Sequence, residues 1–300
     1  MMHILEDYDI TKQHGSIIMS DSINDDIVDR YCSCMMISGK SKKTIYQYKR
    51  AIRRFAEFIR MSLVDIGTYE IRYYLVCEKE RGLSNRSLEN IRSILSAFYG
   101  WMFNEEIISK NPFSNVQPIK YSKKLKKGFS EVEIDAIRSS CRSNRDRAIV
   151  EVLLSSGVRV SELVNMDVSD VNFNNMSVHV RHGKGDKDRF TYLNNIAAIH
   201  LDQYLRSRSE RGNALFYNKR HDRLKPGGVR LMLNQLGESA NVEMVHPHKF
   251  RRTFATRLAS RGMNIHEIRK LLGHSNINTT LEYISVDDYS VELSYRRLVA

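Results

Sequence analysis

Five lysines lie within the eight residues between positions 120 and 127, in a stretch that has no helical spacing of apolar residues. Such a segment cannot add to a hydrophobic core, so it runs over the surface or between domains. A chain of 300 residues also exceeds what one compact core usually holds. We therefore expect two domains joined by a basic linker over residues 114–128, which either stays solvated or crosses a nucleic-acid backbone. The five lysines are Lys120, Lys123, Lys124, Lys126 and Lys127.

The residues before the linker have the apolar spacing of helices. One apolar stripe recurs every three or four positions and would share one face of a helix capped by Ser41. The stripe consists of Ile45, Tyr48, Ile52, Phe55 and Ile59. Residues 69–80 and 84–102 indicate two more helices, and a short fourth segment ends before Pro112. We expect a bundle of about four helices over residues 21–113, after an aperiodic tail of residues 1–20.

Residues 129–300 mix helical and strand patterns. The stretches 176–181 and 190–193 are rich in β-branched and aromatic residues, and the polar turn between them indicates a β-hairpin. Ser130 and Glu133 form a capping-box pair that starts a helix, and Gly157 ends the next one. Further helices are expected at about 195–208, 226–240, 248–260, 264–272 and 287–298. The expected fold class is mainly α with a small antiparallel β-sheet, an α+β arrangement.

The charge balance points to a polyanionic partner. Lysines and arginines number 47 against 35 aspartates and glutamates, for a net charge of +12. No apolar run is long enough to span a membrane, and the first residues do not read as a signal peptide. The four cysteines have neither zinc spacing nor a secreted disulfide framework. We expect a cytoplasmic, nucleoid-associated protein with no membrane partner.

Two clusters in the second half of the chain carry possible phosphate chemistry. Arg159 and Glu162 can share one face of a helical turn, and arginine clamps phosphate oxygens with two hydrogen bonds. A pair at this spacing is also a common structural ion pair. Lys184 lies in the turn of the expected hairpin. It is either a solvated turn lysine or a cation that reaches a substrate.

The helix that begins near His248 can be analysed by angle. At about 100° per residue, Arg251 lies roughly 60° from the middle of the apolar stripe and Arg252 roughly 160° away. We therefore expect Arg251 at the buried margin and Arg252 pointing outward, with His248 on the side of Arg251. A semi-buried histidine–arginine pair needs an anionic partner, which a phosphate would supply. The stripe consists of Phe250, Phe254 and Leu258.

The fourth cluster is His274, which follows a capping glycine, and Tyr283, nine residues later. His274 is either a cap for helix carbonyls or part of a site. Tyr283 is one of fifteen tyrosines and by itself could be a packing residue. The histidines show no zinc spacing such as HExxH, so we expect no metal.

Together and in this order, these residues resemble the tyrosine recombinase, or phage integrase, family. The stretches Gly157–Leu163, His248–Thr256 and Leu271–Tyr283 carry the likeness, which covers residues 129 to about 295 and, more loosely, the bundle before them. There are two departures. Arg252 stands where relatives often have histidine, and residues 155–158 are a variant of the usual Thr-Gly-Leu. Neither departure removes a catalytic group.

The resemblance implies a core-binding helical bundle and a C-terminal catalytic domain that cuts and rejoins DNA strands. Tyr283 would attack the phosphate and leave a 3′-phosphotyrosyl link, with no metal, ATP or other cofactor. Glu162 would support the catalytic cations. His248 is the candidate base for the tyrosine proton and Lys184 the candidate acid for the leaving oxygen, and the reverse assignment stays open. The residues that would hold the phosphate oxygens are Arg159, Arg251 and His274.

The implied partners are double-stranded DNA recombination sites and three further copies of the chain, in a homotetramer formed by exchange of the C-terminal helix. The sequence leaves open whether the reaction is integration, excision or chromosome-dimer resolution. A type IB topoisomerase that relaxes DNA, and a non-catalytic DNA-binding protein on the same fold, are the alternatives. Candidate DNA contacts are Lys42, Lys43, Lys123, Lys124, Lys126, Lys127 and Arg252.

Overall fold

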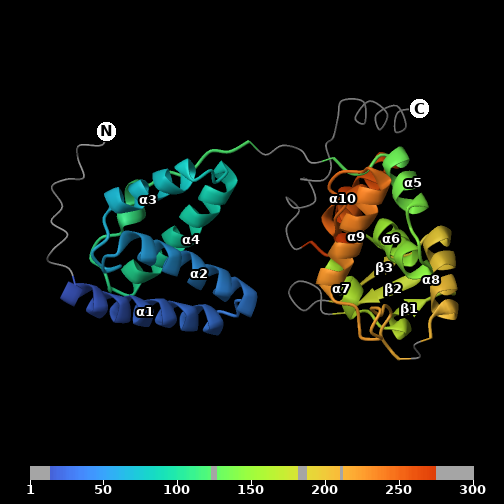
Figure 1. The fold of residues 1–300 in the computed structure, drawn as a ribbon, viewed down its shortest axis with the longest axis horizontal. Helices are drawn as coiled ribbons and strands as arrows, with labels where there is room; N and C mark the ends of the chain where they lie inside the picture. Colours follow the sequence, from blue (N-terminus) through green and yellow to red (C-terminus); the bar gives the residue numbers. More distant parts are fainter. Residues whose placement is uncertain (1–13, 123–126, 182–187, 210–211, 275–300) are drawn as a thin grey trace. The chain divides into compact units, whose positions relative to one another are not determined.

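The computed structural model describes residues 14–122, 127–181, 188–209 and 212–274, with only the backbone described for residues 14–22. The chain divides into two compact units between Lys123 and Lys124 (Figure 1). This division falls inside the segment 114–128 that the sequence predicts as a linker. The expected fold class, mainly α with a small antiparallel sheet, is confirmed.

The first unit is a bundle of α-helices joined by short turns. Ser41 and Ser84 cap two of the helices, because their hydroxyls accept hydrogen bonds from the backbone N–H groups of Thr44 and Ser87. Ile52 and Phe55 of the predicted stripe are fully buried in its core. The elements are α1 (His14–Ile37), α2 (Lys42–Ile59), α3 (Thr68–Glu80), α4 (Asn85–Asn104) and a 3-10 turn, η2 (Pro112–Asn115).

Two expectations for this unit are wrong. Helix α1 begins at His14, inside the expected tail of residues 1–20. Its buried residues lie on one helical stripe, which sequence inspection passed over. The stripe consists of Ile27, Val28, Tyr31, Cys32 and Met35. The expected short fourth helix before Pro112 is instead a run of turns, because Glu106 adopts a left-handed conformation (φ 57°) that ends α4.

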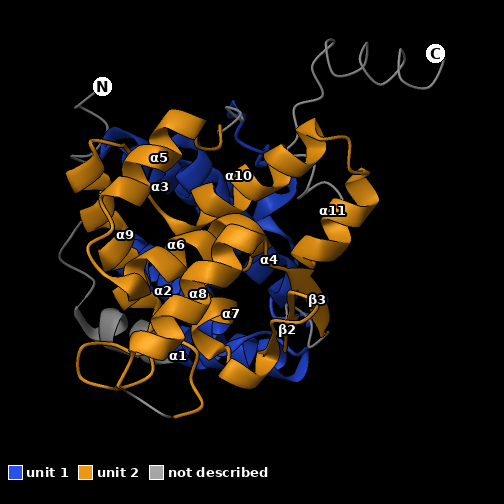
Figure 2. Ribbon diagram, turned by 90° about the vertical axis from the view of Figure 1, so that its right-hand side faces the viewer, with its two compact units in different colours: residues 1–123 blue, residues 124–300 orange. Residues whose placement is uncertain are grey.

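The second unit is built around α6 (Asn144–Ser156), which is buried along most of its length. It packs against α8 (Asn195–Ser207) and α10 (Pro247–Ser260) (Figure 2). The predicted capping box of Ser130 and Glu133 starts the first helix of the unit and is confirmed. The other helices are α5 (Glu131–Ser139), α7 (Val160–Asn165), η3 (Val168–Asp170), α9 (Pro226–Ala240) and α11 (Ile265–Leu272).

The sheet of this unit has three antiparallel strands in the order β1-β2-β3. The predicted hairpin is formed by β2 (Ser177–Val180) and β3 (Arg189–Tyr192), with Val180 opposite Arg189. Its connection, which includes Lys184, lies outside the described residues. The strand β1 (Val171–Asn172) was not predicted, because two residues are too few to show a periodicity.

The turn between α6 and α7 rests directly on α10. Gly157 ends α6 with a left-handed backbone (φ 61°), and a Cβ at this position would lie 2.3 Å from the ring of Phe254 on α10. Arg159 follows as the N-cap of α7. The two helices that carry the predicted arginines are therefore held together at one point. Among the described residues, no helix combines the length and the apolar content that a membrane span needs.

Candidate active site

Arg159 and Glu162 form the centre of the candidate site. The backbone N–H of Arg159 donates to Glu162 Oε2 at 2.7 Å, and its guanidinium Nη1 donates to Oε1 at 2.7 Å. The carboxylate side chain is 6% exposed and the arginine 22%. The pair therefore caps α7 and at the same time orients a partly exposed guanidinium.

Arg189 joins this pair, although the sequence analysis did not single it out. Its Nη1 and Nη2 donate to the two oxygens of Glu162 at 2.9 and 2.8 Å, so the carboxylate accepts four hydrogen bonds. A signal was present in the sequence. Side chains of a strand alternate between its faces, and Thr191, two residues later, is fully buried. An arginine on that buried face needs a carboxylate partner, but the sequence cannot say which one.

The charge of the two arginines fixes the protonation state of Glu162. Burial by itself raises the pKa of this carboxyl group. The hydrogen bonds and charge of Arg189, followed by those of Arg159, outweigh burial and lower the pKa to about 2. Glu162 is thus ionised at every pH at which the protein would work.

Three arginines bind three consecutive carbonyl groups at the end of α11. Arg189 Nε donates to the carbonyl of Leu271 at 2.8 Å, Arg251 Nη2 to that of Leu272, and Arg159 Nη2 to that of Gly273 at 3.2 Å. These carbonyls form the negative end of the helix and have no partners within it. Segments far apart in the sequence thereby converge next to His274 (Figure 2 shows α11 beside β3).

Arg251 lies at the buried margin of α10, as the helical angle predicts. Arg251 is 2% exposed, and its Nη1 donates to the carbonyl of Gly157 at 2.7 Å. Its hydrogen bonds to the carbonyls of Gly157 and Leu272 hold the guanidinium in place. The three arginines and Glu162 together carry a net charge of +2.

Burial and the nearby arginines lower the pKa of both histidines of the site. Burial, followed by the charges of Arg251, Arg159 and Arg189, lowers the pKa of His274 to about 3 against the opposing effect of Glu162. His248 is exposed on the first turn of α10. Lost hydration, followed by nearby arginines of which Arg251 is the first, lowers its pKa as well. Neutral imidazoles can each donate one hydrogen bond and accept one.

Arg252 does not point outward, so that prediction is wrong. The residue is 8% exposed, and its Nη1 donates to the backbone carbonyl of Lys127 at 3.2 Å. Nearby, the backbone N–H of Phe129 donates to Thr253 Oγ1 at 2.8 Å. The end of the linker therefore covers this side of α10. A helical angle locates a side chain relative to the apolar stripe, but it does not show which other segment covers it.

The remaining predicted residues are distributed as follows. Lys42 and Lys43 are exposed in the first turn of α2 in the first unit, and Lys127 is exposed in the second. Three candidate lysines of the linker, the hairpin lysine, the proposed nucleophile and the predicted C-terminal helix 287–298 lie outside the described residues. These residues are Lys123, Lys124, Lys126, Lys184 and Tyr283.

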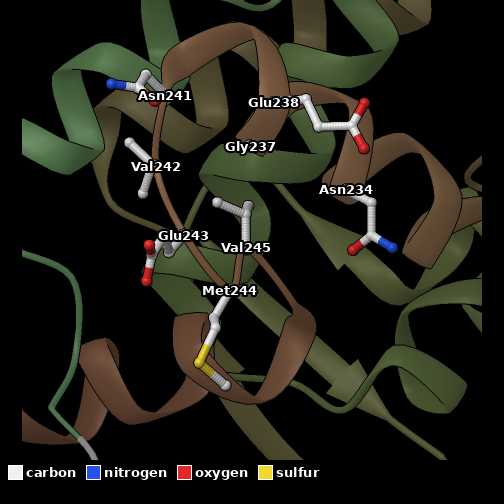
Figure 3. Close-up of a pocket in the computed structure, with 8 residues that line it drawn as sticks. All are labelled: Asn234, Gly237, Glu238, Asn241, Val242, Glu243, Met244 and Val245. Atoms are coloured by element: carbon white, nitrogen blue, oxygen red, sulfur yellow. The ribbon is translucent and has the colours of Figure 1, made fainter.

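A hollow beside α9 is separate from this cluster. It lies between the C-terminal half of α9 and the loop before α10 (Figure 3). Two carboxylates, Glu238 and Glu243, line it, so it is unsuited to a phosphate. In the described part of the chain, no group of three or more histidine, cysteine or acidic side chains could hold a metal ion. The hollow is lined by Asn234, Gly237, Glu238, Asn241, Val242, Glu243, Met244 and Val245.

Comparison with protein families matches both units. Residues 129–289 match the model described as "Phage integrase family", and residues 27–109 match "Phage integrase, N-terminal SAM-like domain". Tyrosine recombinase XerA of Pyrococcus horikoshii is 32% identical over 88% of this chain and 90% of its own length. Tyrosine recombinase XerC of Leptospira interrogans is 34% identical over 86% of this chain and 87% of its own.

A solved structure has the same fold. A fragment of the Tn1549 transposon integrase, in complex with a circular intermediate DNA, is similar over 91% of this chain and 99% of that chain. The TM-score is 0.73 and the sequence identity is 20%. The arrangement of helices and sheet described above is therefore shared with a DNA-bound protein.

We predict that the imidazole of His274 stays neutral down to about pH 5 in the DNA-free protein. Its pKa of about 3 lies below the ordinary value of 6.5 because burial and three arginines disfavour the charged ring. The ring resonances of isotope-labelled histidine, followed from about pH 8 downward, measure this. His274→Asn identifies the signal, and a midpoint near the ordinary value would contradict the prediction.

The sign of the accompanying stability change follows from the same pKa. The unfolded chain takes up the His274 proton near pH 6.5 and the folded chain near 3, so between these values the unfolded state binds more protons. Acidification through this window therefore lowers the free energy of unfolding. Glu162 adds to the loss between its ordinary pKa of 4.5 and its folded value of about 2.

Proposed function

This chain belongs to the phage integrase family and is a tyrosine site-specific DNA recombinase, and on that premise we propose how its residues carry out the reaction. Arg159 and Arg251, in the cluster that they form with Arg189 and Glu162, bind one phosphate of the DNA. The observation that carries the proposal is the convergence of three guanidinium groups on the end of α11, beside His274. A phosphodiester, with one negative charge, complements such a site.

Tyr283 is the nucleophile. Its phenolic oxygen bonds to the phosphorus as the 5′-oxygen of the next nucleotide leaves, which gives a 3′-phosphotyrosyl link and a free 5′-hydroxyl. A 5′-hydroxyl from the partner strand later attacks the link and releases the tyrosine. The covalent link conserves the energy of the phosphodiester bond, so no ATP is consumed.

Arg159 and Arg251 bind the non-bridging oxygens, and His274 donates a further hydrogen bond. The transition state gathers negative charge on these oxygens, so fixed cations stabilise it more than the ground state. Removal of one such donor lowers the rate by about 10²–10³-fold. Arg159 is the more exposed of the two arginines, which suits it to first contact with DNA.

His248 and Lys184 carry the two proton transfers. A free tyrosine has a pKa of about 10, and its full ionisation at neutral pH costs about 4 kcal/mol. His248 is neutral and exposed, which suits a base that removes this proton. Lys184 protonates the leaving 5′-oxygen from the connection between β2 and β3.

The substrate is double-stranded DNA that carries recombination sites. The net charge of +12 and the exposed Lys42, Lys43 and Lys127 favour contact with its backbone. Lys123, Lys124 and Lys126 extend that contact along the linker, whereas the buried Arg252 is no longer a candidate. The reaction is integration, excision or dimer resolution, in the cytoplasm at the nucleoid. The recombinase relatives favour strand exchange over relaxation of DNA and over binding without catalysis.

Replacement of Tyr283 by phenylalanine should abolish the covalent intermediate. A nicked duplex that bears a candidate site traps the intermediate, because the short 5′-hydroxyl strand diffuses away. We expect a protein–DNA adduct on a denaturing gel with the wild-type protein and none with Tyr283→Phe. Tyr289→Phe is the control and should react normally. An adduct that survives Tyr283→Phe would refute the assignment.

A sulfur-containing substrate separates the two proton transfers. When sulfur replaces the bridging 5′-oxygen, the leaving thiolate has a conjugate-acid pKa of about 8.5 and needs no acid. Lys184→Ala should then cleave the oxygen substrate slowly and the sulfur substrate at nearly the wild-type rate. His248→Ala should stay slow on both. If the sulfur substrate instead restored the cleavage rate of His248→Ala and not that of Lys184→Ala, His248 would be the acid and Lys184 the base.

Assembly on DNA should depend on the last helix. We propose that residues 287–298 dock on a neighbouring protomer, so that four protomers join two recombination sites. A chain truncated after Val286 should bind single sites but form no higher assembly, as measured by light scattering of the DNA complexes. Full-length Tyr283→Phe is the control and should assemble. Unchanged assembly of the truncated chain would refute the proposal.

A further inference from the structure

We propose that Arg189 is a positioning residue that joins the β2–β3 hairpin, Glu162 and the end of α11 into one support for Arg159 and His274. The inference deepens the proposed function and rests on it, because the support matters only if those residues bind the phosphate. Arg189 itself does not touch the DNA in this proposal.

The hydrogen bonds of Arg189 described above are all donated to other groups of the protein. Each of its three guanidinium nitrogens donates at least one, namely Nη1 and Nη2 to Glu162 and Nε to the carbonyl of Leu271, at 2.8–2.9 Å. Its side chain is 9% exposed, compared with 22% for Arg159. The planar guanidinium is therefore used to hold protein groups at fixed angles.

The backbone at the end of α11 is packed against the side chain of Arg189. Gly273 has a left-handed conformation (φ 65°), and a Cβ there would lie 2.9 Å from Arg189 Cδ and 3.0 Å from its Nε. The residue that follows is His274. Two contacts at Gly273 therefore fix the position of His274. Arg159 binds the carbonyl of Gly273, and the side chain of Arg189 packs against its Cα.

Arg189 also fixes the base of the hairpin. It is the first residue of β3 and pairs with Val180 of β2, just beyond the connection that carries Lys184. Through Glu162 it is bonded to the cap of α7, from which Arg159 projects. One side chain thus ties together the three segments that present a phosphate-binding arginine, a histidine and the proposed acid. Small errors in such positions cost rate, because reacting groups must meet in a narrow geometry.

The chain contains a matched control. Arg138 makes a similar two-bond contact with a buried carboxylate, with Nε and Nη2 at 2.8 and 2.9 Å from the oxygens of Glu151. Its Nη1 also lies 3.3 Å from Asp135 Oδ1. Glu151 keeps a second partner, Arg147, as Glu162 keeps Arg159. Arg138→Met and Arg189→Met therefore remove the same kind of interaction from two places in one unit, only one of which adjoins the candidate site.

The experiment measures DNA affinity and the single-turnover cleavage rate of the nicked duplex separately. We expect Arg189→Met to lower the cleavage rate by about 10–100-fold, the usual effect of removing a group that orients catalytic residues, while affinity is unchanged. Arg138→Met should leave both at the wild-type level. Arg189→Lys keeps the charge but not the three directed bonds, so its rate should lie between the other two.

A second readout needs no cleavage. His274 is faced by Arg251 from α10, Arg189 from β3, and Arg159 and Glu162 from the start of α7. Loss of the positive charge at position 189 should raise the pKa of His274 in the DNA-free protein, followed through its ring resonances. Arg138→Met should leave the pKa of His274 unchanged, and Arg189→Lys should raise it less than Arg189→Met does.

The outcomes distinguish failure of the proposed recombinase function from failure of the positioning role of Arg189. If the wild-type protein forms no adduct, the proposed function fails, and the His274 titration still tests the contacts of Arg189. If the wild type forms the adduct and Arg189→Met cleaves as fast, or no more slowly than Arg138→Met, the positioning role is wrong. Equal losses of affinity and rate would place Arg189 on the DNA and overturn the inference as well. Should Arg189→Met not fold, a wild-type rate for Arg189→Lys overturns it and a reduced rate supports it.

Discussion

The candidate site depends on the hydrogen bonds that the buried carboxylate of Glu162 accepts from Arg159 and Arg189. Two arginines that approach each other in a poorly hydrated place repel, and each needs a partner for its charge. One carboxylate with four hydrogen bonds meets that need for Arg159 and Arg189 together.

The carbonyl groups at the end of α11 accept hydrogen bonds from guanidinium N–H groups that Glu162 does not bind. They are dipoles without net charge, so they satisfy guanidinium N–H groups and leave the cationic charge in place. Arg251 donates hydrogen bonds to the carbonyls of Gly157 and Leu272. Burial, followed by the charges of Arg251, Arg159 and Arg189, keeps His274 neutral. Metal-free phosphate chemistry in such a site would rest on fixed guanidinium charges, with imidazoles acting as neutral donors or acceptors.

Local features of the site followed from the sequence, whereas its long-range contacts did not. The pairing of Arg159 with Glu162 and the buried margin of Arg251 depend on spacings of a few residues along one helix. The partner of Arg189 lies 27 residues away and the segment that covers Arg252 lies 125 residues away. No periodicity encodes such pairings. The roles of Lys184 and Tyr283 rest on sequence resemblance alone, because both lie outside the described residues.

The burial of Arg252 gives the basic linker a defined end point. Arg252 binds the carbonyl of Lys127, and Thr253 binds the N–H of Phe129, so the last linker residues are attached to α10. That helix also carries His248 and Arg251. Covalent continuity then limits how far the lysines that precede Lys127 can lie from the arginine cluster, since a few residues of chain span only about 3.3–3.6 Å each. The basic linker is therefore joined directly to the helix that carries two of the proposed catalytic residues.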